Sequence, residues 1–228
     1  FCTLLALLTR RVTMKFTRVA MRPLVSSPKR ILFFGGDEVS LATLKRVVER
    51  SQRVGGDVVV VHPPAPPVAV GKKAAKPSSG DLPCGAPPTV CGTNPVGDFC
   101  REHGLRAFEV DHPKSMAKSS VCGDVLSAAA SFDATVVCSC RYFIPDSLLR
   151  EAPPAINMHP SLLPKYRGAS PIIETLRRGD TEGGVSVIKL EPGLLMDCGD
   201  VLEQRTLAID PWCDLREYFP RATEAGAA

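Results

Sequence analysis

The first ordered pattern along the chain is a short apolar run followed by apolar positions at helical spacing. Residues 30–34 are apolar after one arginine, and residues 57–61 form a second run rich in β-branched side chains. Between the two runs, apolar side chains recur at Val39, Leu41, Leu44, Val47 and Val48. Strand, helix and strand in this order predict a βαβ unit with parallel strands and a right-handed crossover.

The same alternation continues toward the C-terminal half. We expect strands over residues 105–110, 133–138, 155–158, 185–190 and 201–207. We expect helices over residues 96–103, 117–130 and 172–178, and a short helix near Pro145. The pattern predicts an α/β fold with a doubly wound, mostly parallel open sheet that is Rossmann-like. We assign residues 30–210 to this domain and treat residues 211–228 as a tail.

Residues 63–95 interrupt the pattern. The segment is rich in Pro, Ala, Gly and Ser, holds no periodicity, and carries a basic patch at Lys72, Lys73 and Lys76. This composition is typical of a loop, and a loop of this length inside a compact domain is usually functional or disordered. The sequence therefore predicts a flexible insertion.

Composition narrows the class of protein. The chain has 228 residues, is 44% hydrophobic and carries a net charge of +4, which fits one α/β domain and excludes global disorder. Its apolar runs are shorter than the ~20 residues that span a bilayer, so we expect no membrane segment. The nine cysteines lack the spacing of a zinc site, and Cys138 and Cys140 lack that of a redox pair. We expect reduced thiols and no metal.

The N-terminal 29 residues have a composition of their own. Residues 1–36 contain no Asp or Glu, while basic side chains are spread among Leu, Val, Ser and Thr. This acid-poor, Arg-rich composition predicts an organellar transit peptide over residues 1–29 and a location in the mitochondrial matrix. Two other interpretations stay open: a translated upstream region, with Met14 or Met21 as the true start, and a disordered tail.

The turn after the first strand bears on nucleotide binding. A dinucleotide fold needs the pattern G-x-G-x-x-G, whereas Gly35 and Gly36 are followed by Asp37 and Glu38. Two carboxylates at a helix N-terminus suit the helix dipole but repel a pyrophosphate. We therefore predict a structural turn with acidic capping and no nicotinamide cofactor.

Candidate chemistry gathers in residues 156–200. Strand alternation places Asn157 and His159 on one side, at the C-terminal end of a parallel strand, where open α/β sheets form ligand crevices. An amide can hydrogen-bond a developing oxyanion, and an imidazole can move a proton near neutral pH. Asp197, in a glycine-punctuated loop, is the candidate to orient the imidazole. The alternative is structural, because a His or Asn at a strand end often only satisfies a loop.

The residues around this site resemble a known family. The similarity is to the signature of the 10-formyltetrahydrofolate-dependent formyltransferases, and it is carried by Asn157-x-His159, Ser161-Leu-Leu-Pro164, Tyr166-Arg-Gly168, Pro171 and Gly179-Asp180. The resemblance extends from about Arg30 to Asp210, with an insertion near residues 80–94. It implies the same fold class and a formyl-transfer activity.

The resemblance also implies a role for particular residues. The family's Asn, His and Asp fall on Asn157, His159 and Asp197. Asn157 and His159 would stabilise a tetrahedral oxyanion, His159 would relay the proton, and Asp197 would orient His159. The family's folate-contacting segment falls on Ser161, Leu162, Leu163 and Pro164. The implied co-substrate is 10-formyltetrahydrofolate, with neither a metal nor a covalent intermediate.

Within the family, the sequence is most similar to the members that act on methionyl-tRNA. We assign Lys72, Lys73 and Arg167 to tRNA contact, since basic side chains can neutralise acceptor phosphates. A solvated charge run would look the same as the lysine pair. The resemblance implies a monomer that formylates methionyl-tRNA for mitochondrial translation.

Departures from the family pattern leave alternatives open. Two extra residues precede Asp197, and Val70 stands where an arginine is common. We recognise no counterpart of the family's C-terminal tRNA-binding domain and expect the chain to lack it. A glycinamide ribonucleotide acceptor would need a phosphate loop where Asp37 and Glu38 stand. A sugar-nucleotide or other amine acceptor stays open, as does a truncated, non-catalytic folate-binding fragment.

Overall fold

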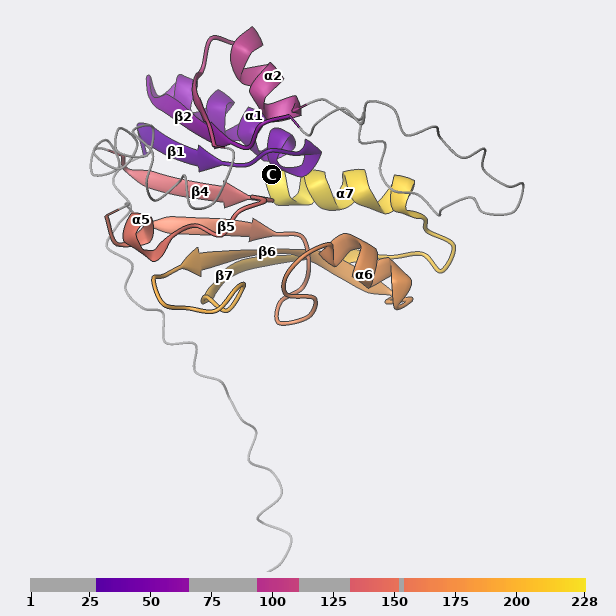
Figure 1. Cartoon of the computed structure of the whole chain (residues 1–228). Helices are drawn as coiled ribbons and strands as arrows, with labels where there is room; N and C mark the ends of the chain where they lie inside the picture. Colours follow the sequence, from indigo (N-terminus) through magenta and orange to yellow (C-terminus); the bar gives the residue numbers. More distant parts are fainter. Residues whose placement is uncertain (1–27, 66–93, 111–131, 152–153) are drawn as a thin grey trace, which may run out of the picture.

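A computed structural model describes residues 28–65, 94–110, 132–151 and 154–228. In these ranges the chain forms a seven-stranded sheet flanked by helices (Figure 1). In chain order the elements are β1 (Arg30–Phe34), α1 (Glu38–Arg53), β2 (Asp57–His62), α2 (Pro95–Glu102), β3 (Arg106–Glu109), β4 (Ala134–Cys138), α5 (Asp146–Glu151), β5 (Ala155–His159), α6 (Pro171–Arg177), β6 (Glu182–Leu190), β7 (Val201–Ala208) and α7 (Leu215–Ala227).

The sheet has the order β3-β2-β1-β4-β5-β6-β7. The strands from β3 to β5 are parallel, while β6 is antiparallel to β5 and β7 is antiparallel to β6. The strand order reverses between β1 and β4, and ligands of open α/β sheets bind beyond the strand ends at such a reversal. The prediction of a doubly wound, mostly parallel sheet is confirmed.

The core lies on both faces of this sheet because successive strand residues point to opposite sides. On one face, Phe33 of β1 and Val60 of β2 belong to a buried cluster with Leu44 of α1. On the other face, Leu32 and Phe34 belong to a cluster that includes side chains of α5. The parallel strands are buried on both sides, which explains why they are continuous apolar runs in the sequence.

The segment after Asp210 differs from the predicted tail. Asp214 caps helix α7 by accepting a hydrogen bond from the backbone N–H of Glu217 at 3.0 Å. Tyr218 of this helix is fully buried and packs in a cluster with Ile172 of α6. The domain boundary predicted at Asp210 is therefore too early. Pro220 lies inside α7. Because proline is unfavourable in a helix interior, the sequence did not predict a helix here.

The strand β6 begins three residues earlier than the predicted start at 185. Its first residues include Gly183 and Gly184, which weaken a strand pattern. A Cβ atom on Gly183 would lie 2.0 Å from the Tyr218 hydroxyl oxygen, so glycine is needed where α7 approaches the sheet. Strand β6 therefore uses glycine to make room for the C-terminal helix.

Several predicted features lie outside the described residues. They are the segment 1–27, the helix over 117–130, and most of the insertion, including Lys72 and Lys73. Among the described helices, none is long and apolar enough to cross a membrane.

Candidate active site

The C-terminal end of β5 places two polar side chains at the edge of a cavity. Asn157 and His159 are two residues apart, so they face the same side of the sheet. Asn157 pairs with Val137 of the parallel strand β4 and with Ile188 of the antiparallel strand β6. Both side chains line a cavity of about 670 Å³. Strands on both sides of β5 therefore hold the two candidate residues in place.

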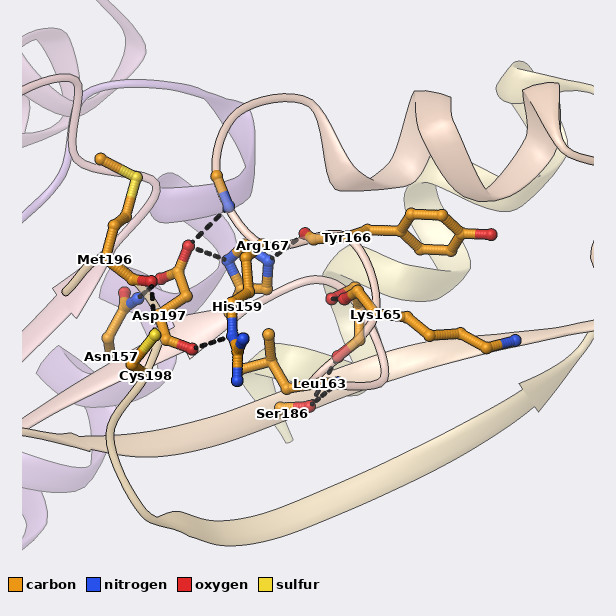
Figure 2. A network of polar contacts seen from close by, with 12 residues as sticks. Asn157, His159, Leu163, Lys165, Tyr166, Arg167, Ser186, Met196, Asp197 and Cys198 are labelled. Atoms are coloured by element: carbon orange, nitrogen blue, oxygen red, sulfur yellow. Dashed lines mark hydrogen bonds and ion pairs between the residues drawn. The ribbon is translucent and has the colours of Figure 1, made fainter.

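Asp197 reaches the same cavity from the loop between β6 and β7. Its Oδ1 accepts a hydrogen bond from Asn157 Nδ2 at 3.2 Å, and its Oδ2 lies 3.6 Å from His159 Nδ1. The side chains of His159 and Asp197 are 7% and 8% exposed. The structure brings the three predicted residues together from two separate segments, and Figure 2 shows them pointing toward one another.

The loop after β5 completes the surroundings of the pair. The Gly168 backbone N–H donates to Asp197 Oδ2 at 2.8 Å, and His159 Nε2 lies 2.8 Å from the Tyr166 carbonyl oxygen. Because a carbonyl only accepts, Nε2 carries a proton. In the neutral ring, Nδ1 is then the unprotonated nitrogen, and it faces Asp197. Of the two neutral tautomers, the Tyr166 carbonyl is compatible with the one protonated on Nε2.

The turn after β1 forms another part of the cavity wall. Asp37 is the N-cap of α1, and its Oδ1 accepts hydrogen bonds from the backbone N–H and the hydroxyl of Ser40, both at 3.0 Å. Its Oδ2 accepts a hydrogen bond from the Ser139 hydroxyl, which follows β4. The predicted structural turn with acidic capping is confirmed, and its carboxylate occupies the helix N-terminus where an anion would otherwise bind.

The predicted folate-contacting segment lies beside the cavity rather than on its wall. The cavity lining includes Pro160 and Gly168 but none of Ser161, Leu162, Leu163 or Pro164. Ser161 is fully buried, and its carbonyl accepts a hydrogen bond from the Ser186 hydroxyl at 2.6 Å. The same hydroxyl accepts from the backbone N–H of Leu163 at 3.0 Å. In this arrangement the segment fixes the loop to β6.

Arg167, which we assigned to tRNA contact, is exposed and also has a partner within the site. Its Nε donates to the Asp197 backbone carbonyl at 3.1 Å. No role was predicted for the side chains of Ser139, Tyr166 and Asp180. Tyr166 and Asp180 belong to the family signature, so their place in that signature could have identified them as candidate functional residues.

A cysteine on the cavity wall is not poised for nucleophilic chemistry. Burial raises the pKa of the Cys140 thiol to about 11, so the thiol is protonated near neutral pH. Among the described residues, no group of three or more His, Cys, Asp or Glu side chains could hold a metal ion. Asn157, His159 and Asp197 can supply hydrogen bonding and proton transfer in this cavity.

An open α/β sheet with an amide, an imidazole and a carboxylate converging beyond its strand ends defines an enzyme class suited to acyl transfer. A formyl transferase family model matches residues 29–227, and the chain belongs to that family.

Curated relatives agree with this assignment. The chain is 32% identical over 199 residues to a methionyl-tRNA formyltransferase of Geobacter metallireducens, a match that covers 86% of this chain and 55% of the relative. It is also 32% identical over 203 residues to one of Geobacter sulfurreducens, covering 87% and 54%. The chain thus spans about half the length of these relatives.

The fold is shared with solved structures. A phosphoribosylglycinamide formyltransferase from Bacillus halodurans superimposes with a TM-score of 0.63 at 18% identity, covering 87% of this chain and 90% of that one. At this identity the likeness establishes the fold alone.

Proposed function

We propose that the protein transfers a formyl group from 10-formyltetrahydrofolate to the α-amino group of methionyl-tRNA, as part of translation in mitochondria. The observation that carries the proposal is the convergence of Asn157, His159 and Asp197 on one cavity. Membership of the formyl transferase family and the names of the relatives support the reaction and the acceptor.

The donor site is consistent with the residues on the cavity wall. A cavity of about 670 Å³ is within the usual size range of small-molecule sites, and it combines apolar walls with a few convergent polar groups. Phe143 and Leu195 line it and are 53% and 80% exposed, so they offer apolar surface at its rim. 10-Formyltetrahydrofolate would supply the formyl carbon that the amine attacks.

The three polar residues divide the work of the transfer. Asn157 uses one amide hydrogen on Asp197, and its second is left to donate to the oxyanion that forms on the formyl group. His159 takes the proton that the attacking amine releases and returns a proton to the leaving nitrogen. Asp197 stabilises the positive charge that His159 then carries. In this scheme His159 carries the transferred proton, and Asn157 and Asp197 stabilise the charges that develop.

The turn after β1 supports a large aminoacyl acceptor over a small phosphorylated one. Asp37 fills the N-terminus of α1 with its own carboxylate, which would repel a phosphate placed there. A small acceptor that relied on this helix terminus for its phosphate would bind poorly. An acceptor whose amino group is carried on tRNA needs no phosphate at this position.

An assay of formyl transfer to methionyl-tRNA tests the proposal. We expect Asn157→Ala to lower kcat/KM by roughly 100- to 1000-fold, the usual cost of one oxyanion donor. Gln52→Ala, which removes an exposed amide on α1, serves as the matched control and should be as active as the unchanged protein. Equal activity of Asn157→Ala and Gln52→Ala would refute the catalytic assignment.

The acceptor and the location are tested separately. Turnover of a sugar amine but not of methionyl-tRNA would replace the proposed acceptor. The mitochondrial proposal is supported by the acid-poor, Arg-rich composition of residues 1–29. A reporter fused to residues 1–29 should be imported into mitochondria, and a reporter that stays in the cytosol would refute that part.

A further inference from the structure

Three consecutive residues of the loop between β5 and α6 contact His159 or Asp197. Tyr166 offers its carbonyl to His159 Nε2, Arg167 donates from Nε to the Asp197 carbonyl, and Gly168 donates its N–H to the Asp197 carboxylate. Figure 2 shows this loop wrapped around the pair. We call residues 166–168 the positioning loop. Its backbone and one guanidinium set where the side chains of His159 and Asp197 lie.

The loop is tied to the protein on its other side through a phenol. The Tyr166 hydroxyl donates to Asp180 Oδ2 at 2.7 Å, and Lys165 Nζ lies 3.5 Å from the same oxygen. This hydrogen bond holds the pKa of Asp180 below its ordinary value and raises the pKa of Tyr166. At neutral pH, a neutral phenol therefore donates to a charged carboxylate, which is the stronger kind of hydrogen bond.

The backbone of Tyr166 explains why such a tie is useful. Its φ is 57°, in the left-handed region, which costs a residue other than glycine about 1–2 kcal/mol. A tyrosine stays in this conformation only if other contacts offset the cost. In this conformation the Tyr166 carbonyl contacts His159 Nε2. Loss of the hydrogen bond from the Tyr166 hydroxyl to Asp180 would therefore shift the carbonyl that contacts the imidazole.

We propose that Tyr166 and Asp180 are positioning residues that fix the proton of His159 on Nε2 for the formyl transfer proposed above. With Nε2–H donated to the Tyr166 carbonyl, the proton released by the attacking amine goes to Nδ1. The protonated ring then donates from Nδ1 to Asp197, which lies 3.6 Å away before the reaction. The proton count balances, since the amine loses one proton and His159 gains it.

Two substitutions separate this proposal from a merely structural role. Tyr166→Phe removes the hydroxyl and keeps the ring and the backbone. Asp180→Ala removes the acceptor, whereas Asp180→Asn keeps an oxygen that can accept the phenol hydrogen. We expect Tyr166→Phe and Asp180→Ala to behave alike, and Asp180→Asn to retain most of the function.

The tautomer is measured directly from the ¹⁵N chemical shifts of the His159 ring in the full chain without substrate. The His159 signals are identified as those missing from the His159→Gln variant. We expect a single Nε2-protonated form in the unchanged protein and in Asp180→Asn. Tyr166→Phe and Asp180→Ala should show a mixture with the Nδ1-protonated tautomer. In the transfer assay, both should lose roughly 10- to 100-fold in kcat, as expected when a catalytic group is misplaced, with KM for methionyl-tRNA little changed.

The outcomes distinguish the proposal from the function on which it rests. Unchanged shifts in Tyr166→Phe and Asp180→Ala would refute the positioning role, whatever the activity. Asp180→Asn as impaired as Asp180→Ala would also refute it, because charge rather than the hydrogen bond would then be needed. Altered shifts in a chain that transfers no formyl group would uphold the positioning and refute the proposed function. If Tyr166→Phe fails to fold, the two Asp180 variants decide.

Discussion

Asp37 and Asp197 are two carboxylates on the wall of one cavity, and their partners differ in kind. Asp37 accepts hydrogen bonds from Ser40 and Ser139, that is, from one backbone N–H and two hydroxyls. Asp197 accepts from the Asn157 amide and the Gly168 N–H, and it faces the imidazole of His159. Asp37 lies in the turn after β1, and Asp197 lies in the loop between β6 and β7, but both line the same cavity. Their location alone therefore does not show that they have different roles.

The comparison teaches that the partners decide what a carboxylate can do. The partners of Asp37 keep their protons through any reaction near neutral pH, so this side chain caps α1 and keeps other anions from that helix terminus. Asp197 faces the imidazole of His159, which can gain a proton. It also accepts one hydrogen bond from the Asn157 amide, whose second hydrogen can be donated to a bound substrate. One carboxylate therefore belongs to the scaffold, while the other can respond to charge that develops in the cavity.

The largest effect is expected at Asp197. Asp197→Asn keeps the size of the side chain and an oxygen for the Gly168 N–H, but it removes the charge opposite His159. We expect kcat for formyl transfer to fall roughly 100-fold or more, because the protonated imidazole loses its stabilising charge. Activity within a few-fold of the unchanged protein would show that Asp197 is a scaffold residue like Asp37.

Asp37 should give the opposite result. Asp37→Ala removes the N-cap of α1 and is expected to cost about 1 kcal/mol of unfolding free energy, with turnover changed by less than about threefold. Urea denaturation measures the stability, and Asp37→Asn is the matched control because asparagine caps helices nearly as well. A 100-fold loss of kcat in a folded Asp37→Ala protein would end the distinction between the two carboxylates.

The sequence predicted the positions of Asn157 and His159 more directly than that of Asp197. The period of two along β5 predicted that Asn157 and His159 lie on the same side of the strand. The parallel strands were predicted from their continuous apolar runs. Asp197 rested on resemblance, since it lies 38 residues after His159, at the end of a loop with two extra residues. The antiparallel register places the end of β6 beside Ala155, at the start of β5, so the loop has to fold back along β5 before Asp197 can contact Asn157 and His159.

Contacts between distant residues account for most of what sequence analysis missed. The hydrogen bond from Ser139 to Asp37 joins residues 102 apart, and no local pattern marks it. The hydrogen bond from Arg167 to the Asp197 carbonyl joins two loops 30 residues apart, so the sequence did not predict it. The helix α7 escaped notice because Pro220 interrupts it, although Tyr218 is buried in the core.

The smallest effect, and the finest test of the scaffold carboxylate, is expected at Ser139. Its hydroxyl donates to Asp37, but its φ of 46° is left-handed and costs a serine about 1–2 kcal/mol. Ser139→Ala loses the hydrogen bond and keeps the strain, so we expect a loss of about 1 kcal/mol in urea denaturation. Ser139→Gly loses the same bond but relieves the strain, so its stability should lie close to that of the unchanged protein. If Ser139→Gly is no more stable than Ser139→Ala, the left-handed backbone at residue 139 does not carry the expected cost, and this account of Ser139 is wrong.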